Sequence, residues 1–160
     1  MISYYFDSSA WVKVYVTETG TSWVTTVFDA GLTYGSPLYQ ISSASIAVVE
    51  VAAAIARHER TGKITTTERR ELYRRLVFDS ENRTSRLGLS DGILQLAAEL
   101  TQRRPLRGFD AIHLATALAF TQNLIASGLP PAIFVSADTT LCTAATAEGL
   151  AADNPNDHED

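Results

Sequence analysis

Four acidic residues interrupt apolar stretches of this 160-residue chain, at places where a packed core has no use for a negative charge. Leaving a carboxylate in such surroundings costs several kcal/mol unless the group is paired or binds a cation. The stretches are spread from one end of the chain to the other, so a fold that buries them has to bring their acids together. We therefore expect a single converged acidic site, formed by Asp7, Glu50, Asp110 and Asp138.

The length and composition fit one globular domain, with 46% hydrophobic and 19% charged residues. We expect this domain to span residues 1–152 and to be followed by a flexible, acidic tail over residues 153–160. The single cysteine, Cys142, excludes an internal disulfide and has no neighbouring zinc ligands, which fits a cytoplasmic protein. The sequence shows no signal peptide pattern, and its longest uncharged stretch is too polar to span a membrane.

The charge is unevenly distributed along the chain. The segment from Arg57 to Arg107 holds 12 of the 13 Lys and Arg residues and seven acids, a net charge of +5. The remainder holds one base and 11 acids, a net charge of −10. A molecule polarised in this way could hold a polyanion on one face and metal ions on the other. Solvated helix faces with ion pairs such as Glu71 with Arg75 explain the same distribution equally well.

Short β-prone runs alternate with longer helical patterns. Extended segments are expected at residues 2–6, 39–42, 86–89 and 132–136. Helices are expected at residues 10–15, 23–28, 43 or 45 to 60, 65–77, 90–100, 109–121 and 138 or 139 to 149. Because strands alternate with helices and helices predominate, the pattern predicts an α/β fold, a three-layer α/β/α sandwich with a mainly parallel central sheet.

In this architecture, the four acids are expected to lie at one edge of the sheet. Asp7 and Asp138 each follow a predicted strand directly, and sites in open parallel sheets form beyond the carboxyl ends of the strands. Glu50 and Asp110 lie early in predicted helices, where the helix N-terminus favours an anion modestly. Helix capping alone would also explain Asp7 and Asp138.

The chemistry of four carboxylates narrows the possible functions. Oxygen ligands without His or Cys suit hard cations such as Mg²⁺ or Mn²⁺. Such ions would neutralise the site toward a phosphodiester, polarise the phosphate and activate a water molecule. Paired carboxylates also serve glycosidases, but two would suffice there, and no run of sugar-stacking aromatic residues is evident.

The segments around these acids also carry a family resemblance. They read YYFDSSAWVKVYVTETG, SSASIAVVEVAAAIAR, FDAIHLATAL and IFVSADTTLCTAATAEGL, and together they cover almost the whole chain. In these blocks and their order, the chain resembles PIN-domain proteins, specifically the toxin ribonucleases of VapBC-type toxin–antitoxin pairs. The opening FDSSAWVK and the later FDAIHLATAL are the most specific pieces.

The resemblance implies a Mg²⁺- or Mn²⁺-dependent endoribonuclease with an α/β/α fold. It implies that Asp7, Glu50, Asp110 and Asp138 are the catalytic residues and ligate the metal, with Glu50 holding or orienting the attacking water. It further implies a cognate antitoxin protein that blocks the site, and a homodimer. Many relatives carry another acid two residues after the fourth one. This chain has Thr140 there, so we expect a second ion to bind weakly or only with substrate.

Further residues are expected to support the site. Side chains expected to surround the acids are Ser8 (with Ser9 as an alternative), Ser136, Thr139 and His113, although capping explains either serine better. Basic side chains that could hold the RNA backbone are Lys13, Arg83, Arg86 and Arg107. For Lys13, a surface lysine with an apolar stem is an equally good interpretation.

Two alternatives to a ribonuclease stay open at this point. One is a non-catalytic relative that keeps the acidic pocket and binds RNA or a partner protein. The other is a nuclease that cuts DNA. The presence of all four acids favours an enzyme, but no motif indicates the RNA target or the cut site.

Overall fold

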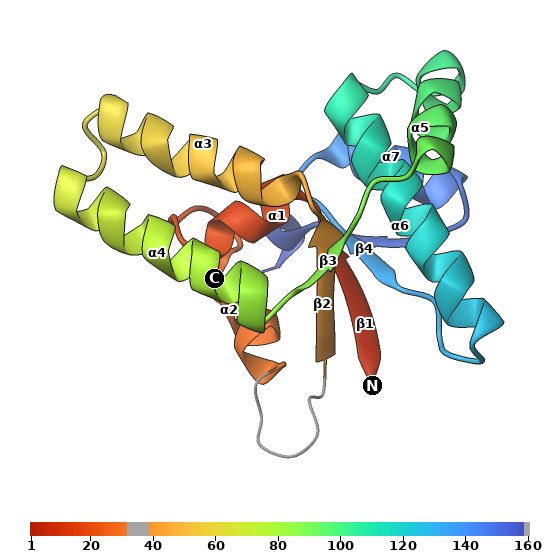
Figure 1. The fold of residues 1–160 in the computed structure, drawn as a ribbon, viewed down its shortest axis with the longest axis horizontal. Coiled ribbons are helices and arrows are strands. Elements are labelled where there is room, and N and C mark those ends of the chain that lie inside the picture. Colours follow the sequence, from red (N-terminus) through yellow and green to blue (C-terminus); the bar gives the residue numbers. More distant parts are fainter. Residues whose placement is uncertain (32–38, 159–160) are drawn as a thin grey trace.

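Five parallel strands form the central sheet of the computed structural model, which describes residues 1–31 and 39–158 (Figure 1). The strands are β1 (Ile2–Phe6), β2 (Tyr39–Ala44), β3 (Ser85–Leu87), β4 (Ile133–Val135) and β5 (Ala151–Asp153). Their order is β3-β2-β1-β4-β5, and Tyr4 of the central strand lies opposite Ile41 on one side and Ile133 on the other. All carboxyl ends therefore meet at one edge of the sheet.

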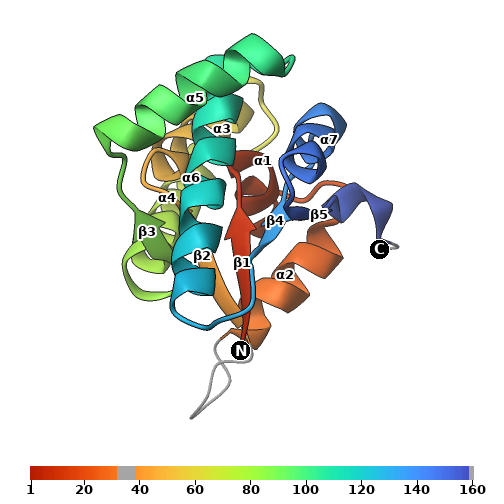
Figure 2. The same ribbon diagram turned by 90° about the vertical axis from the view of Figure 1, so that its right-hand side faces the viewer.

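Helices cover both faces of this sheet (Figure 2). They are α1 (Ser8–Trp11), α2 (Thr21–Ala30), α3 (Ala47–Arg60), α4 (Thr66–Asn82), α5 (Asp91–Arg103), α6 (Gly108–Ala126) and α7 (Thr139–Ala147), with short 3₁₀ helices η1 (Val12–Val14) and η2 (Pro155–Asp157). One apolar layer joins the sheet to α1–α4, and the other joins it to α5–α7. The predicted three-layer α/β/α fold with a parallel sheet is confirmed.

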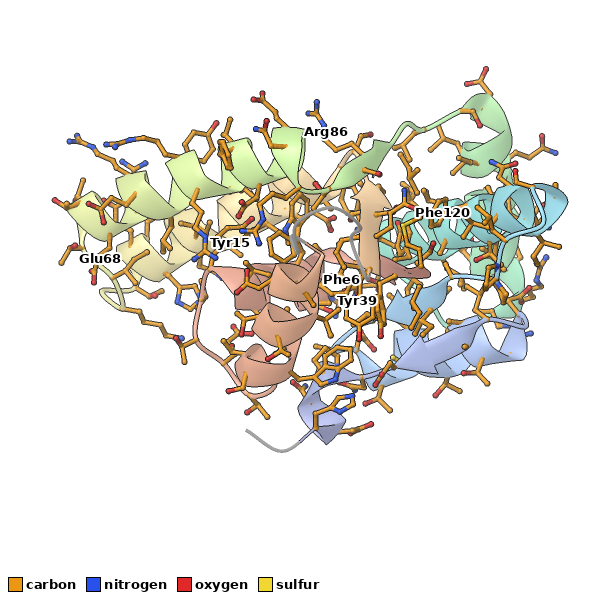
Figure 3. The ribbon with its side chains drawn as sticks, turned by 90° about the horizontal axis from the view of Figure 1, so that it is seen from below. Phe6, Tyr15, Tyr39, Glu68, Arg86 and Phe120 are labelled. Atoms are coloured by element: carbon orange, nitrogen blue, oxygen red, sulfur yellow. The ribbon has the colours of Figure 1, made fainter. Side chains whose placement is uncertain are left out.

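The two layers follow from the alternation of side chains in β1. Tyr4 and Phe6 point into the layer with α1–α4, whereas Tyr5 between them points into the layer with α5–α7. Phe6 and Tyr5 are fully buried, and Figure 3 shows Phe6 within the first layer. Burial of each such side chain stabilises the fold by about 1.5–3 kcal/mol.

Several predicted helix boundaries match the structure because their caps are local. Thr65 and Glu68 form the expected capping box of α4, and the Ser90 hydroxyl accepts a hydrogen bond from the Ile93 N–H at the start of α5. The possible helix start at Ser43 is wrong. That residue belongs to β2, and its buried hydroxyl donates a hydrogen bond to the Phe6 carbonyl oxygen at 2.6 Å.

The structure also differs from the expected flexible tail. Asp153 ends β5, which pairs with β4, and its carboxylate lies 2.7 Å from Nε2 of His158. The His158 ring in turn stacks on Trp23 of α2 at 4.2 Å, and Pro155 is buried. Tertiary pairing holds this segment although its composition is polar. Residues 159 and 160 lie outside the described residues. Of the described helices, none combines the length and the apolar character that a bilayer span requires.

Candidate active site

Asp7 follows β1 directly and lies at the centre of a buried hydrogen-bond network. Its Oδ1 accepts hydrogen bonds from the Ala10 N–H at 2.9 Å and the Ser9 hydroxyl at 2.7 Å, and its Oδ2 accepts one from the Ser136 hydroxyl at 2.6 Å. Asp7 therefore caps α1, as the simpler alternative predicts, but it is only 3% exposed. All three donors are neutral, and Asp7 forms no ion pair with a described lysine or arginine.

The loop after β4 brings the second acid beside the first. The Ser136 hydroxyl, which donates to Asp7, accepts a hydrogen bond from the Asp138 N–H at 3.1 Å. The Ser9 hydroxyl likewise accepts one from the Ala137 N–H at 2.9 Å, which ties the two strand ends together. Asp138 is exposed and caps α7. Its Oδ1 accepts a hydrogen bond from the Leu141 N–H at 3.1 Å.

Asp110 reaches the same edge from the first turn of α6. Its half-buried carboxylate accepts a hydrogen bond from the backbone N–H of Arg107. Burial raises the pKa of Asp110, and the negative charges of Asp138 and Asp7 raise it further. These three aspartates therefore share one electrostatic environment.

Glu50 joins the site through His113 of α6. The Glu50 Oε2 lies 2.7 Å from His113 Nε2, and the opposite ring nitrogen, Nδ1, lies 3.0 Å from the Tyr5 hydroxyl. His113 is 1% exposed, and its ring packs edge-on against Tyr5 at 6.1 Å. This chain of contacts fixes the position of the glutamate from inside the core. The sequence placed His113 near Asp110 on the same helix; its hydrogen bond instead goes to Glu50.

The site carries negative charge that no lysine or arginine offsets. Within residues 1–31 and 39–158, none of the four acids forms an ion pair with a lysine or arginine. Burial raises the pKa of Asp7, although His113 and the hydrogen bonds from Ser136, Ser9 and Ala10 lower it. Oxygen donors with an excess of negative charge are what a hard divalent cation requires, so these residues fit Mg²⁺ or Mn²⁺.

The acids are gathered but do not yet form a closed coordination shell. Among the described residues, no group of three or more His, Cys, Asp and Glu side chains is already arranged to hold a metal ion. Asp138 is the most adjustable member because it is exposed and held by one hydrogen bond to a backbone amide. Release of a helix cap of this kind costs about 0.5–2 kcal/mol.

Some of the residues expected around the acids contact them in the structure, and others do not. Ser136 contacts Asp7 as expected. Ser9 makes the second hydroxyl contact to Asp7, whereas Ser8, at the first position of α1, makes no side-chain hydrogen bond to it. Thr139 lies exposed in the first turn of α7, and Thr140 is exposed beside it. The sequence alone left both serines open, and the contacts of the folded chain select Ser9.

Two of the four basic residues proposed for RNA contact have partners within the protein. Lys13 is 3% exposed, and its Nζ donates a hydrogen bond to the Thr19 carbonyl oxygen at 2.7 Å. The Arg83 guanidinium pairs with two aspartates and stacks on an aromatic ring, which leaves its side chain 12% exposed. Internal partners thus occupy both cations, which argues against a contact between either one and RNA. Arg107 is exposed at the start of α6, and Arg86 of β3 projects outward (Figure 3).

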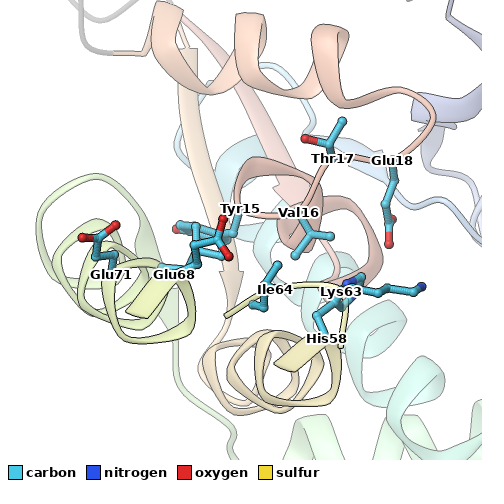
Figure 4. Close-up of a pocket in the computed structure, with 10 residues that line it drawn as sticks. Tyr15, Val16, Thr17, Glu18, His58, Lys63, Ile64, Glu68 and Glu71 are labelled. Atoms are coloured by element: carbon cyan, nitrogen blue, oxygen red, sulfur yellow. The ribbon is translucent and has the colours of Figure 1, made fainter. Parts of the chain in front are cut away.

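Two hollows border α3, and only one of them contains a predicted site residue. Figure 4 shows a pocket of about 490 Å³ between the segment after η1 and the α3–α4 hairpin, lined in part by Tyr15, His58, Lys63 and Glu71. It includes none of the four acids. The other, of about 460 Å³, lies between α1 and α3 and includes Glu50. We call it the α1–α3 groove.

Comparisons with known proteins agree with this arrangement. Residues 4–141 match the model of the PIN domain. The chain is 36% identical over 115 residues to the ribonucleases VapC45 and VapC49 of Mycobacterium tuberculosis, covering 72% of this chain and 74% of each relative.

Solved structures with low sequence identity share the fold. FitAcB from Neisseria gonorrhoeae aligns with a TM-score of 0.59 at 15% identity, covering 97% of this chain and 98% of that one. VapBC2 from Rickettsia felis, solved with a DNA fragment from its promoter, aligns with a TM-score of 0.60 at 12% identity, covering 96% and 98%.

Proposed function

Because the chain belongs to the PIN-domain family, we propose that it is a metal-dependent endoribonuclease and the toxin of a VapBC-type toxin–antitoxin pair. The observation that carries this proposal is the convergence of Asp7, Asp110, Asp138 and Glu50 at one sheet edge without a lysine or arginine partner among the described residues. A purely structural cluster of acids would be expected to carry such partners.

The residues divide the chemistry between them. Asp7, Asp110 and Asp138 would hold Mg²⁺ or Mn²⁺, which when bound polarises the phosphate and makes water a better nucleophile. Glu50, held by His113, orients the attacking water. The oxygen of that water forms a bond to phosphorus as the bond to the leaving oxygen breaks; the attacking water gives up one proton to the surrounding water, and the leaving oxygen takes up one proton from it. Ser9 and Ser136 keep the Asp7 carboxylate turned toward the site.

The first test is cleavage of total cellular RNA by the purified protein with Mg²⁺, with Mn²⁺ and with EDTA. We expect discrete fragments with either metal and intact RNA in EDTA. Cleavage that persists in EDTA contradicts metal dependence. RNA binding without cleavage under all conditions supports a non-catalytic module instead. A parallel reaction with single-stranded DNA of mixed sequence decides whether DNA is also a substrate.

The location of the metal has its own test. A crystal soaked in Mn²⁺ should show anomalous density between Asp7, Asp110 and Asp138. Density elsewhere would contradict the ligand assignment while leaving nuclease activity open. Titration calorimetry with Mn²⁺ would count the ions, and we expect one strong site because Thr140 replaces the further acid found in many relatives.

The proposed toxin role implies two protein contacts. One is a cognate antitoxin, expected to be a small protein encoded next to this chain, whose co-expression should suppress cleavage. The other is a second copy of the chain, which light scattering of the purified protein would detect as a homodimer. A cytoplasmic location is proposed with the toxin role.

A further inference from the structure

The α1–α3 groove connects the candidate active site to two arginines that form no ion pair with an acid in the described part of the chain. Its walls include Ser8 and Ser9 of α1 and Glu50, Ala53, Arg57 and Arg60 of α3. Glu50 is the member that it shares with the proposed catalytic site. The groove runs beside α3 from Glu50 to Arg57 and Arg60 in the last turns of that helix, which extends away from the sheet (Figure 1).

The spacing of the α3 residues explains why they line one groove. Glu50, Ala53, Arg57 and Arg60 are separated by three, four and three positions, which places them on the same helical face. A rise of 1.5 Å per residue puts Arg57 about 10 Å and Arg60 about 15 Å from Glu50 along the helix axis. The small side chain of Ala53 leaves room between the acidic and basic ends.

Charge distinguishes these two arginines from much of the basic segment. Six of the 13 Lys and Arg residues form ion pairs with acids, including Lys13, Arg83 and Arg104. Arg57 and Arg60 are exposed and have no ion pair with any described residue.

The other acid at the groove does not cancel their charge. Glu18 also borders the groove, but its carboxylate lies 3.3 Å from the buried Lys13 Nζ. The basic end of the groove is thus available to an anion.

We propose that the α1–α3 groove holds the phosphate backbone of the RNA strand on one side of the scissile bond, with Arg57 and Arg60 contacting phosphates. This inference rests on the proposed ribonuclease function. Guanidinium groups bind phosphate oxygens with two parallel hydrogen bonds, and contacts of this kind position a strand without reading its bases. Arg57 and Arg60 are therefore positioning residues that act on affinity rather than on the cut-site sequence.

The test compares two double variants of equal charge change. The first is Arg57→Gln with Arg60→Gln. The matched control is Arg70→Gln with Arg74→Gln, which removes two exposed arginines from α4 that likewise form no ion pair with described residues. All four side chains are exposed, so both proteins should melt within a few degrees of the unmodified chain.

Two readouts are needed. In the cleavage assay, loss of the groove arginines should raise KM about 10-fold or more with kcat unchanged, because phosphate contacts outside the reacting centre bind substrate and transition state equally. In anisotropy measurements with a labelled single-stranded RNA in EDTA, the slope of log affinity against log salt should become shallower by about 1.4, since each lost phosphate contact contributes about 0.7. The control should shift both quantities much less.

Equal KM values and equal salt slopes for the two double variants would overturn the groove proposal. An unmodified protein that cuts no RNA contradicts the proposed function instead, and the anisotropy comparison then still decides whether the groove binds RNA. A change in kcat with KM unaltered would also overturn it, because it would place the arginines in the chemical step.

Discussion

Two buried aspartates, Asp79 and Asp7, differ in what neutralises them. Asp79 of α4 is 1% exposed, accepts a hydrogen bond from the Tyr15 hydroxyl at 3.0 Å, and lies 3.6 Å from Arg75 and 3.3 Å from Arg83. Asp7 is 3% exposed and receives hydrogen bonds from two serine hydroxyls and one backbone amide. Both carboxylates are satisfied, but only the first has cations beside it.

The difference separates a structural acid from a functional one. The arginines beside Asp79 link α4 to α2, because Arg83 also pairs with Asp29 at 2.7 Å and lies over the Phe28 ring at 4.3 Å. Asp7 links two strand ends and is left with a net negative charge that repels its acidic neighbours. An uncompensated charge costs stability unless a cation offsets it, so it is retained where the cation has a function.

The largest effect should follow from Asp7→Asn. The change removes a proposed ligand while keeping its shape, so cleavage should fall by more than the roughly 100-fold that loss of an outer hydrogen-bond partner costs a metal site. The folded protein should not be destabilised, because a buried charge is lost. Cleavage rates and thermal melts in EDTA measure both effects. Full activity in this variant would remove Asp7 from the site.

Asp79→Ala should lower the stability of the fold and leave cleavage unchanged, the reverse of Asp7→Asn. It removes the acceptor of the buried Tyr15 hydroxyl and leaves Arg83 with Asp29 as its one carboxylate partner among the described residues, so the free energy of unfolding should fall by about 3 kcal/mol in urea denaturation. Cleavage per folded molecule should stay unchanged. Asp29→Ala is the control, because that partner of Arg83 is 63% exposed and its loss should cost below about 1 kcal/mol. Equal losses in both variants would show that burial of Asp79 is unimportant.

A smaller effect concerns pH in the absence of metal. The folded state raises the pKa of Asp7 above its ordinary 3.8, so it binds more protons than the unfolded state. The contribution of Asp7 to stability is therefore most favourable at low pH and falls as pH rises through the raised pKa. The stability gained from Asp7→Asn should accordingly grow as pH rises above 3.8 in EDTA, and it should level off once the pH exceeds the raised pKa. A gain that shrinks with pH would reverse the assigned direction.

The smallest effect is expected at a paired acid near the surface. Hydrogen bonds from Arg103 and then Arg104 lower the pKa of Glu148 from 4.5 to about 2. The stabilisation is thus present above pH 4.5 and lost as pH falls toward about 2. Glu148→Gln should lower the free energy of unfolding by less than about 1 kcal/mol at neutral pH. It should leave the free energy of unfolding unchanged near pH 2. Chemical denaturation at the two pH values provides the measurement.

Much of the fold was predictable because its signals are local. The alternation of β-prone and helical segments predicted the three layers, and the capping-box pattern of Thr65 and Glu68 predicted the start of α4. The strand Ala151–Asp153 was missed because it is three residues long and lacks β-branched and aromatic residues; only pairing with β4 reveals it. The end of β2 at Ala44 was missed for a similar reason, because the serines of this strand are polar but buried.

The site was predictable as a set of acids but not as a set of contacts. Glu50, surrounded by Val and Ala, signalled a function by its sequence context alone. Its partner His113 lies 63 positions away, and no spacing rule could link the two. Asp79 was overlooked for the opposite reason, because the end of α4 is polar and resembles a solvated face. Lys13 was judged by its charge, whereas the turn that ends at Thr19 decides its burial.

The pairing of β1 with β4 also governs the order in which activity can arise during synthesis. The hydrogen bond between Asp7 and Ser136 closes a loop of 129 positions, and contacts of such separation form late and slowly. The first acid leaves the ribosome many seconds before the last, at the usual 5–20 residues per second. A nascent or prematurely ended chain that stops short of the end of β4 therefore contains Asp7, Glu50 and Asp110 but lacks Ser136 and Asp138, and it has no means of completing the acidic site.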